Sequence, residues 1–130
     1  MTDSQGVPEE FSDEELIAAY LHSWSGENSA STSWANDALD DLVHQTPERA
    51  WSILCPLVER AATDQILAII AAGPLEDLLC LHGPAFLDRV EEQARREPRF
   101  RHGLAGVWGS STMEPRVYQR IREVVGNETL

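Results

Sequence analysis

Three aspartates and a histidine lie within two helical turns of one another. Their side chains are the ones in this chain most suited to binding a metal or a charged partner. Asp37 and Asp41, and likewise Asp40 and His44, are spaced i,i+4, which makes them neighbours on the surface of a helix. Carboxylates together with an imidazole are able to hold a divalent metal. A solvated acidic face with His44 near the helix C-terminus fits the same residues. We favour a partner-facing acidic patch and expect no metal ligands.

A second group of reactive residue types contains Glu76, Asp77, Cys80 and His82. Positions two apart do not face each other on a helix, so Cys80 and His82 form no local nucleophile pair. The adjacent acids point to different faces and make a poor acid–base pair. We therefore predict no catalytic residue. An enzyme or metal-binding protein that uses either group of residues remains the alternative function.

Two Gly-Pro pairs enclose this second group, at Gly73-Pro74 and Gly83-Pro84. Glycine adopts the left-handed conformation that ends helices, and proline is favoured at the first helical position. We predict that the chain ends a helix at each glycine and starts another at each proline. Acids just after Pro74 would then lie on the favourable side of the helix dipole.

The charged residues exclude several functions. All ten basic residues are arginine, so a phosphate-binding loop of the Walker type and Schiff-base chemistry lack their lysine. Residues 1–48 contain eleven acids and no arginine, whereas residues 49–130 contain eleven acids and all ten arginines. An acidic leading third repels nucleic acid and favours a basic protein as partner. The predicted partner-binding residues are Glu27, Trp34, Asp37, Asp40 and Asp41.

Four arginines form the basic cluster of the chain, and acids lie among them. We predict a self-neutralised surface, because exposed charges of both signs mix there. Glu91 and Glu92 stand four residues before Arg95 and Arg96, in the favourable order for pairs on a helix. The arginines of the cluster are Arg95, Arg96, Arg99 and Arg101.

The composition and the first residues of the sequence predict the cellular compartment. The sequence has no secretory signal, and its apolar runs are shorter than a bilayer span. We expect a cytoplasmic protein without membrane contact or cofactor. Cys55 and Cys80 match neither a redox nor a zinc motif, which predicts buried, reduced thiols. The oligomeric state is not predicted, and an oligomeric structural protein is a second alternative.

The spacing of apolar residues predicts an all-α fold of about seven or eight short helices. Ser12 and Glu15 form a capping box before the first helix, and Pro56 predicts a bend or short break in the third. A weak repeat at an offset of 37 residues suggests a HEAT-like stack of helix pairs; an irregular bundle is the other option. We predict a disordered acidic tail over 1–10, a single helical domain over 11–126 and a C-terminal tail over 127–130. The predicted helices begin near Asp13, Ser33, Pro47, Asp64, Pro74, Pro84, Phe100 and Pro115.

Three segments resemble a family of short bacterial proteins known only as a domain of unknown function. They read PERAWSILCPLVERA, AAGPLEDLLCLHG and PRFRHGLAGVWG, and the resemblance extends over roughly residues 14–125. It implies a bacterial origin and a helical fold, and it assigns no catalytic residue. The function we expect is therefore a non-catalytic interaction module, similar to the small acidic proteins that neutralise toxins or nucleases.

Overall fold

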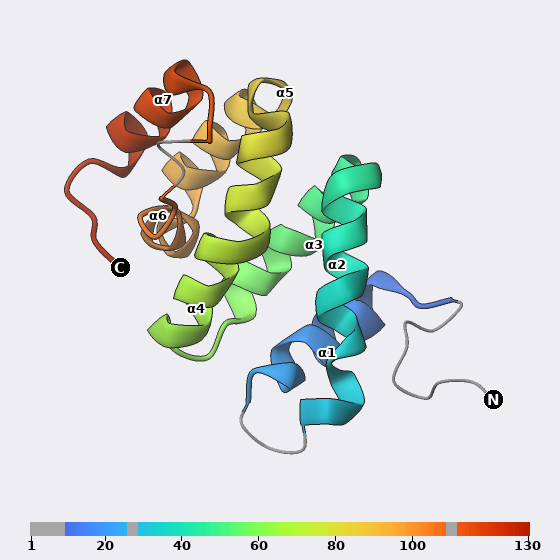
Figure 1. Cartoon of the computed structure of the whole chain (residues 1–130). Helices are drawn as coiled ribbons and strands as arrows, with labels where there is room; N and C mark the ends of the chain where they lie inside the picture. Colours follow the sequence, from blue (N-terminus) through green and yellow to red (C-terminus); the bar gives the residue numbers. More distant parts are fainter. Residues whose placement is uncertain (1–9, 26–28, 109–111) are drawn as a thin grey trace. The chain divides into compact units, whose positions relative to one another are not determined.

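The first helix, α1 (Asp13–Ser23), begins where the sequence predicts. The Ser12 hydroxyl accepts the Glu15 backbone N–H at 3.0 Å, and the Glu15 carboxylate accepts the Ser12 backbone N–H at 2.7 Å. This reciprocal pair satisfies two backbone donors that a helix start leaves without partners. The computed structural model describes residues 10–25, 29–108 and 112–130 (Figure 1), so most of the predicted N-terminal tail lies outside the described residues.

The chain separates into two compact units, residues 1–57 and 58–130. Unit 1 contains α1, a short 3₁₀ turn η1 (Ser29–Thr32), α2 (Trp34–Gln45) and most of α3 (Pro47–Arg60). Helices α1 and α2 pack against each other (Figure 1). Their buried residues recur at helical spacing, which is why one face of each helix is apolar. These buried residues are Leu16, Ile17, Tyr20, Ala38, Leu39, Leu42 and Val43.

Helix α3 is unbroken at Pro56, contrary to one of the two outcomes that we predicted there. Proline removes one backbone hydrogen bond and crowds the preceding turn. Ile53, Leu54 and Leu57 are fully buried on both sides of it. Burial of these side chains stabilises the helical conformation across the proline.

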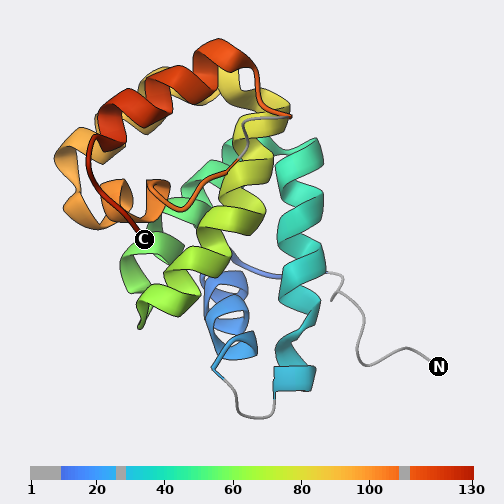
Figure 2. The ribbon, with the colours of Figure 1, turned by 60° about the vertical axis from the view of Figure 1, so that its left-hand side comes forward.

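Unit 2 contains α4 (Asp64–Ile70), a π-helical turn η2 (Ala71–Leu75), α5 (Glu76–Arg96), α6 (Pro98–Leu104) and α7 (Pro115–Val125). Helix α5 packs against α6 and α7 (Figure 2). The described part of the chain contains helices and no strands, so the all-α prediction is confirmed. Pro115 begins α7 as predicted, α6 begins at Pro98, two residues before the predicted start near Phe100, and Gly126 ends the last helix with a φ of 63°.

The predicted break at Gly73-Pro74 is wrong. Asp64–Arg96 is one helical run of 33 residues, and among the described glycines only Gly126 has a positive φ. The chain accommodates Pro74 by widening to a π-turn, in which the Glu76 N–H reaches the Ala71 carbonyl five residues back. Proline in an α-helix removes one backbone donor and crowds the preceding turn. The wider π-turn accommodates both changes without ending the helix.

The second Gly-Pro pair produces a kink. His82 has a non-helical φ of −133° and ψ of 19°, directly before Gly83. A Cβ at Gly83 would lie 2.9 Å from Cγ1 of Val117, so glycine permits the close approach of α5 to α7. Two helical segments therefore meet at a kink at His82, next to the boundary that the sequence predicts at Gly83-Pro84.

Continuity through Gly73-Pro74 also changes the length of the apolar segment. The run Asp64–Arg96 is long and apolar enough to cross a membrane by length and composition, whereas the apolar runs of the sequence are shorter than a bilayer span. Core helices of water-soluble proteins pass the same two criteria. Leu67, Ile70 and Leu75 of this run are fully buried, and 39% of its apolar 18-residue window is buried within the protein.

Candidate functional site

The predicted acidic patch lies on the solvent side of α2. Asp37, Asp40 and Asp41 are exposed, while the opposite face of the helix carries its buried apolar residues. His44 lies in the last turn, as predicted; its Nδ1 is 2.9 Å from the Asp40 carbonyl oxygen and 3.6 Å from the Asp40 carboxylate. Within the described residues, neither Asp37 nor Asp41 forms an ion pair. Both carboxylates are exposed to solvent.

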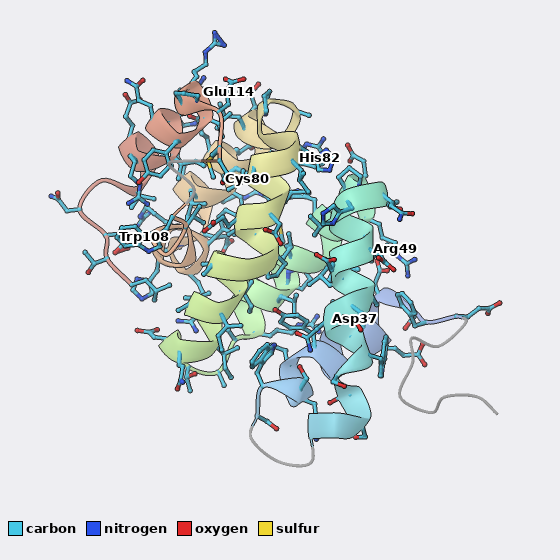
Figure 3. The ribbon with its side chains drawn as sticks, in the orientation of Figure 1. Asp37, Arg49, Cys80, His82, Trp108 and Glu114 are labelled. Atoms are coloured by element: carbon cyan, nitrogen blue, oxygen red, sulfur yellow. The ribbon has the colours of Figure 1, made fainter. Side chains whose placement is uncertain are left out.

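Arg49 is the single arginine of residues 1–57, and it is engaged at the start of α1. Its Nε donates to the Asp13 carboxylate at 2.8 Å, and its Nη2 donates to the Phe11 carbonyl at 3.1 Å. The guanidinium also lies 5.0 Å from the centre of the Phe11 ring, within range of a cation–π contact. Arg49 thus secures the segment before α1 and leaves the α2 aspartates without an arginine from their own unit (Figure 3).

An open groove of about 580 Å³ lies beside this patch and belongs entirely to unit 1. The rings of Phe11 and Trp34 stand 5.5 Å apart at an angle of 47°, a favourable tilted aromatic arrangement. The size is within the usual range for ligand pockets, roughly 300–1,000 Å³. The residues that line the groove are Glu10, Phe11, Glu15, Ala18, Ala19, His22, Thr32 and Trp34.

Hydrogen bonds fix the groove at two places. His22 Nδ1 lies 2.9 Å from the Thr32 hydroxyl oxygen, which joins α1 to the end of η1. Glu15 is held by the capping box that starts α1. The groove is therefore bounded by side chains with defined partners and lined mainly by apolar ones.

The structure brings together Trp34, Asp37, Asp40 and Asp41 on one helix, as the sequence predicts; Glu27 lies outside the described residues. Trp34 is half-buried and forms a wall of the groove. Phe11, which also lines the groove, is not among the predicted site residues. A pair of aromatics at the starts of consecutive helices was the available indication.

Two members of the second predicted group contact residues outside it. Glu76 follows the π-turn within a continuous helix, so no free helix start lies there for it to complement; its carboxylate instead accepts the Trp108 backbone N–H at 2.9 Å. The Cys80 sulfur lies 3.2 Å from the Thr112 hydroxyl oxygen. Cys55 and Cys80 are free thiols and half-buried, less buried than predicted. Across the described residues, no three His, Cys, Asp or Glu side chains are arranged to hold a metal.

Trp108 lies in the connection between α6 and α7. Helix α6 ends at Leu104, and the next residues tighten into i→i−3 bonds, with Gly106 N–H donating to the Gly103 carbonyl at 2.9 Å. Trp108 follows in the connection and is 72% exposed (Figure 3).

The basic cluster of unit 2 is neutralised within the unit, as predicted. Arg95 and Arg96 lie 3.9 Å from Glu91 and Glu92. Arg99 donates to the Ala61 carbonyl at 2.6 Å and lies 3.5 Å from Asp64. Arg101 lies 3.8 Å from Glu128 in the predicted C-terminal tail.

Glu91 has a second role that its i,i+4 spacing did not predict. Its side chain is only 8% exposed and accepts two hydrogen bonds from Arg120 of α7, at 2.7 and 2.6 Å. Fork-to-carboxylate pairing of this kind is among the strongest side-chain interactions. The bonds from Arg120 to Glu91 raise the pKa of the guanidinium above its ordinary value.

The fold and surface together define an all-α protein with a single-signed acidic patch on its first unit and internally paired charges on its second. The chain belongs to a family of unknown function, DUF6869, whose profile matches residues 22–129. The match includes the acidic patch of α2 and leaves out most of α1. No protein of curated function and no solved structure matches the chain.

Proposed function

We propose that the chain is a non-catalytic interaction module whose acidic patch on α2 captures a basic protein. One observation carries the proposal: the carboxylates of Asp37 and Asp41 have no ion-pair partner in the described part of unit 1, while Arg49 is occupied elsewhere. Exposed charge of one sign accelerates association with a partner of the opposite sign and discriminates against others.

The setting that we propose is the bacterial cytoplasm, with a toxin or nuclease as the basic partner. Such enzymes bind phosphates and therefore carry basic surfaces. An acidic helical protein covers that surface without needing catalytic residues of its own. This origin and compartment extend the family resemblance and are part of the proposal.

The experiment is a charge reversal with a matched control. The test variant changes Asp37, Asp40 and Asp41 to Arg; the control changes the exposed Glu59, Glu92 and Glu114 of unit 2 to Arg. Both variants alter the net charge equally. Partners are isolated from a lysate of the native host with the wild-type chain, and the binding of each purified partner is then measured against both variants.

We expect the α2 variant to lose binding while its circular dichroism remains helical, and the control to retain it. The association rate of the wild-type should fall with rising salt, because salt screens exposed charges. Equal binding by the wild-type and the α2 variant would overturn the proposal.

A further inference from the structure

The groove of unit 1 and the acidic patch are parts of one continuous surface. Trp34 forms a wall of the groove at the first residue of α2. Asp37 and Asp41 follow it at i+3 and i+7, which places all three on one stripe of the helix. With a rise of about 1.5 Å per residue, Asp41 lies roughly 10 Å along the axis from Trp34.

The lining of the groove selects the chemistry of an occupant. Phe11, Ala18, Ala19 and Trp34 present apolar surface, which favours an apolar side chain. The formally charged lining residues are Glu10 and Glu15, both acidic, so an anionic ligand would be repelled. Arg49 lies over Phe11, which demonstrates that an aromatic ring of this region accepts a guanidinium.

We infer that the groove receives an amphipathic helix of the basic partner, with an apolar anchor packed against the Phe11–Trp34 pair and Arg or Lys residues one and two turns along, opposite Asp37 and Asp41. Helix-in-groove recognition uses this arrangement of anchors at helical spacing. The inference rests on the proposed function and adds to it the form of the partner and the part of unit 1 that holds the anchor.

The probe is a synthetic 18-residue peptide of leucine and lysine with an amphipathic helical pattern. One control peptide replaces the leucines with serine, and another replaces the lysines with glutamate. The indole N–H resonances of the ¹⁵N-labelled chain report the site of binding, with the Trp34 resonance assigned from a Trp34→Phe variant. We expect the leucine–lysine peptide to shift the Trp34 resonance and both control peptides to leave it unchanged.

A groove-filling substitution provides the second readout. Ala18 is an exposed residue of α1 in the groove, and Ala85 is an exposed residue of α5 outside it. Ala18→Trp should weaken the peptide at least roughly tenfold, about 1.4 kcal/mol, and Ala85→Trp should not. Fluorescence anisotropy of a labelled peptide measures both.

The outcomes separate this inference from the proposed function. Wild-type affinity in Ala18→Trp, or equal binding of the serine peptide, overturns the groove as the anchor site even when charge reversal on α2 abolishes capture of the native partner. Capture that survives charge reversal on α2 overturns the proposed function, whatever the peptide does.

Discussion

In unit 1, a single arginine stands against eleven acidic residues, a net charge of −10; in unit 2, nine arginines stand against eleven acids, a net charge of −2. Unit 2 uses its arginines to join its own elements, as Arg120 does between α7 and Glu91 of α5. In unit 1 the arginine, Arg49, binds the start of α1. The carboxylates of Asp37 and Asp41 are exposed to solvent. Charge in unit 2 therefore serves the fold, whereas charge on α2 has no such role.

Among the described residues, unit 2 alone contains a buried charged side chain, that of Glu91. Glu91 tolerates burial because Arg120 satisfies both of its carboxylate oxygens, and a buried carboxylate without such a partner is strongly unfavourable. No described acid of residues 10–57 is buried. The exposed carboxylates of Asp37 and Asp41 are therefore available to another molecule.

The largest effect should follow from breaking the charge pairing of unit 2. Arg120→Met removes both bonds to Glu91 and leaves that carboxylate with Arg95 at 3.9 Å. We expect Tm to fall by on the order of 10 °C, measured by thermal circular dichroism. Replacing the pair together, as Glu91→Leu with Arg120→Met, should recover most of the loss, because an apolar pair needs no charge compensation. An unchanged Tm in the single variant would show that the Glu91–Arg120 pair does not stabilise unit 2.

The next effect concerns the core of unit 1. Burial raises the pKa of Tyr20 to about 12, from 10.0, because the phenolate is poorly solvated there. Below pH 10 the phenol is neutral in both folded and unfolded chains. Between pH 10 and 12 only the unfolded chain ionises at this residue, so the free energy of unfolding should fall by about 1.4 kcal/mol per pH unit.

Urea unfolding at pH 9, 10.5 and 11.5 measures this slope. Tyr20→Phe removes the ionisable group and should reduce the slope by that amount, while Tyr118 stays in both proteins as a common background. The same slope in wild-type and Tyr20→Phe would show that the Tyr20 phenolate is tolerated in the core of unit 1. It would contradict the conclusion that unit 1 keeps its charges at the surface.

Local features of this fold were predictable from sequence because a few adjacent residues determine them. The capping box of Ser12 and Glu15 acts over three residues, and Pro98, Pro115 and Gly126 impose backbone conformations of their own. The predicted capping box and the predicted helix start at Pro115 are confirmed. The acidic patch also follows from a local rule, since i,i+4 spacing places side chains together on any helix.

The features that sequence missed depend on contacts between distant residues. Gly73-Pro74 predicts the end of a helix, because glycine and proline both favour helix boundaries. The pair alone does not predict that the helix continues through a π-turn. Glu91 and Arg120 are 29 residues apart, and Phe11 and Trp34 meet only after α1 and α2 have packed. Apolar periodicity identifies buried faces but does not choose which faces meet.

The smallest effect distinguishes the two uses of charge most directly. Asp41→Asn removes a like-charge i,i+4 contact with Asp37 and a negative charge near the helix C-terminus, both mildly unfavourable. The free energy of unfolding should rise by about 0.3 kcal/mol, measured as a shift in the urea midpoint at low salt. In 1 M salt the shift should shrink, because screening then acts over about 3 Å.

Glu92→Gln in unit 2 is the matched neutralisation, since Glu92 is similarly exposed and lies 3.9 Å from Arg96. It should lower the free energy of unfolding by a few tenths of a kcal/mol, which is about the value of an exposed helix pair. Opposite signs for the two substitutions would mean that the acidic patch is retained at a small cost in stability, as binding surfaces often are. Destabilisation by Asp41→Asn would instead give that aspartate a structural role, and the proposed partner surface would lose the observation that carries it.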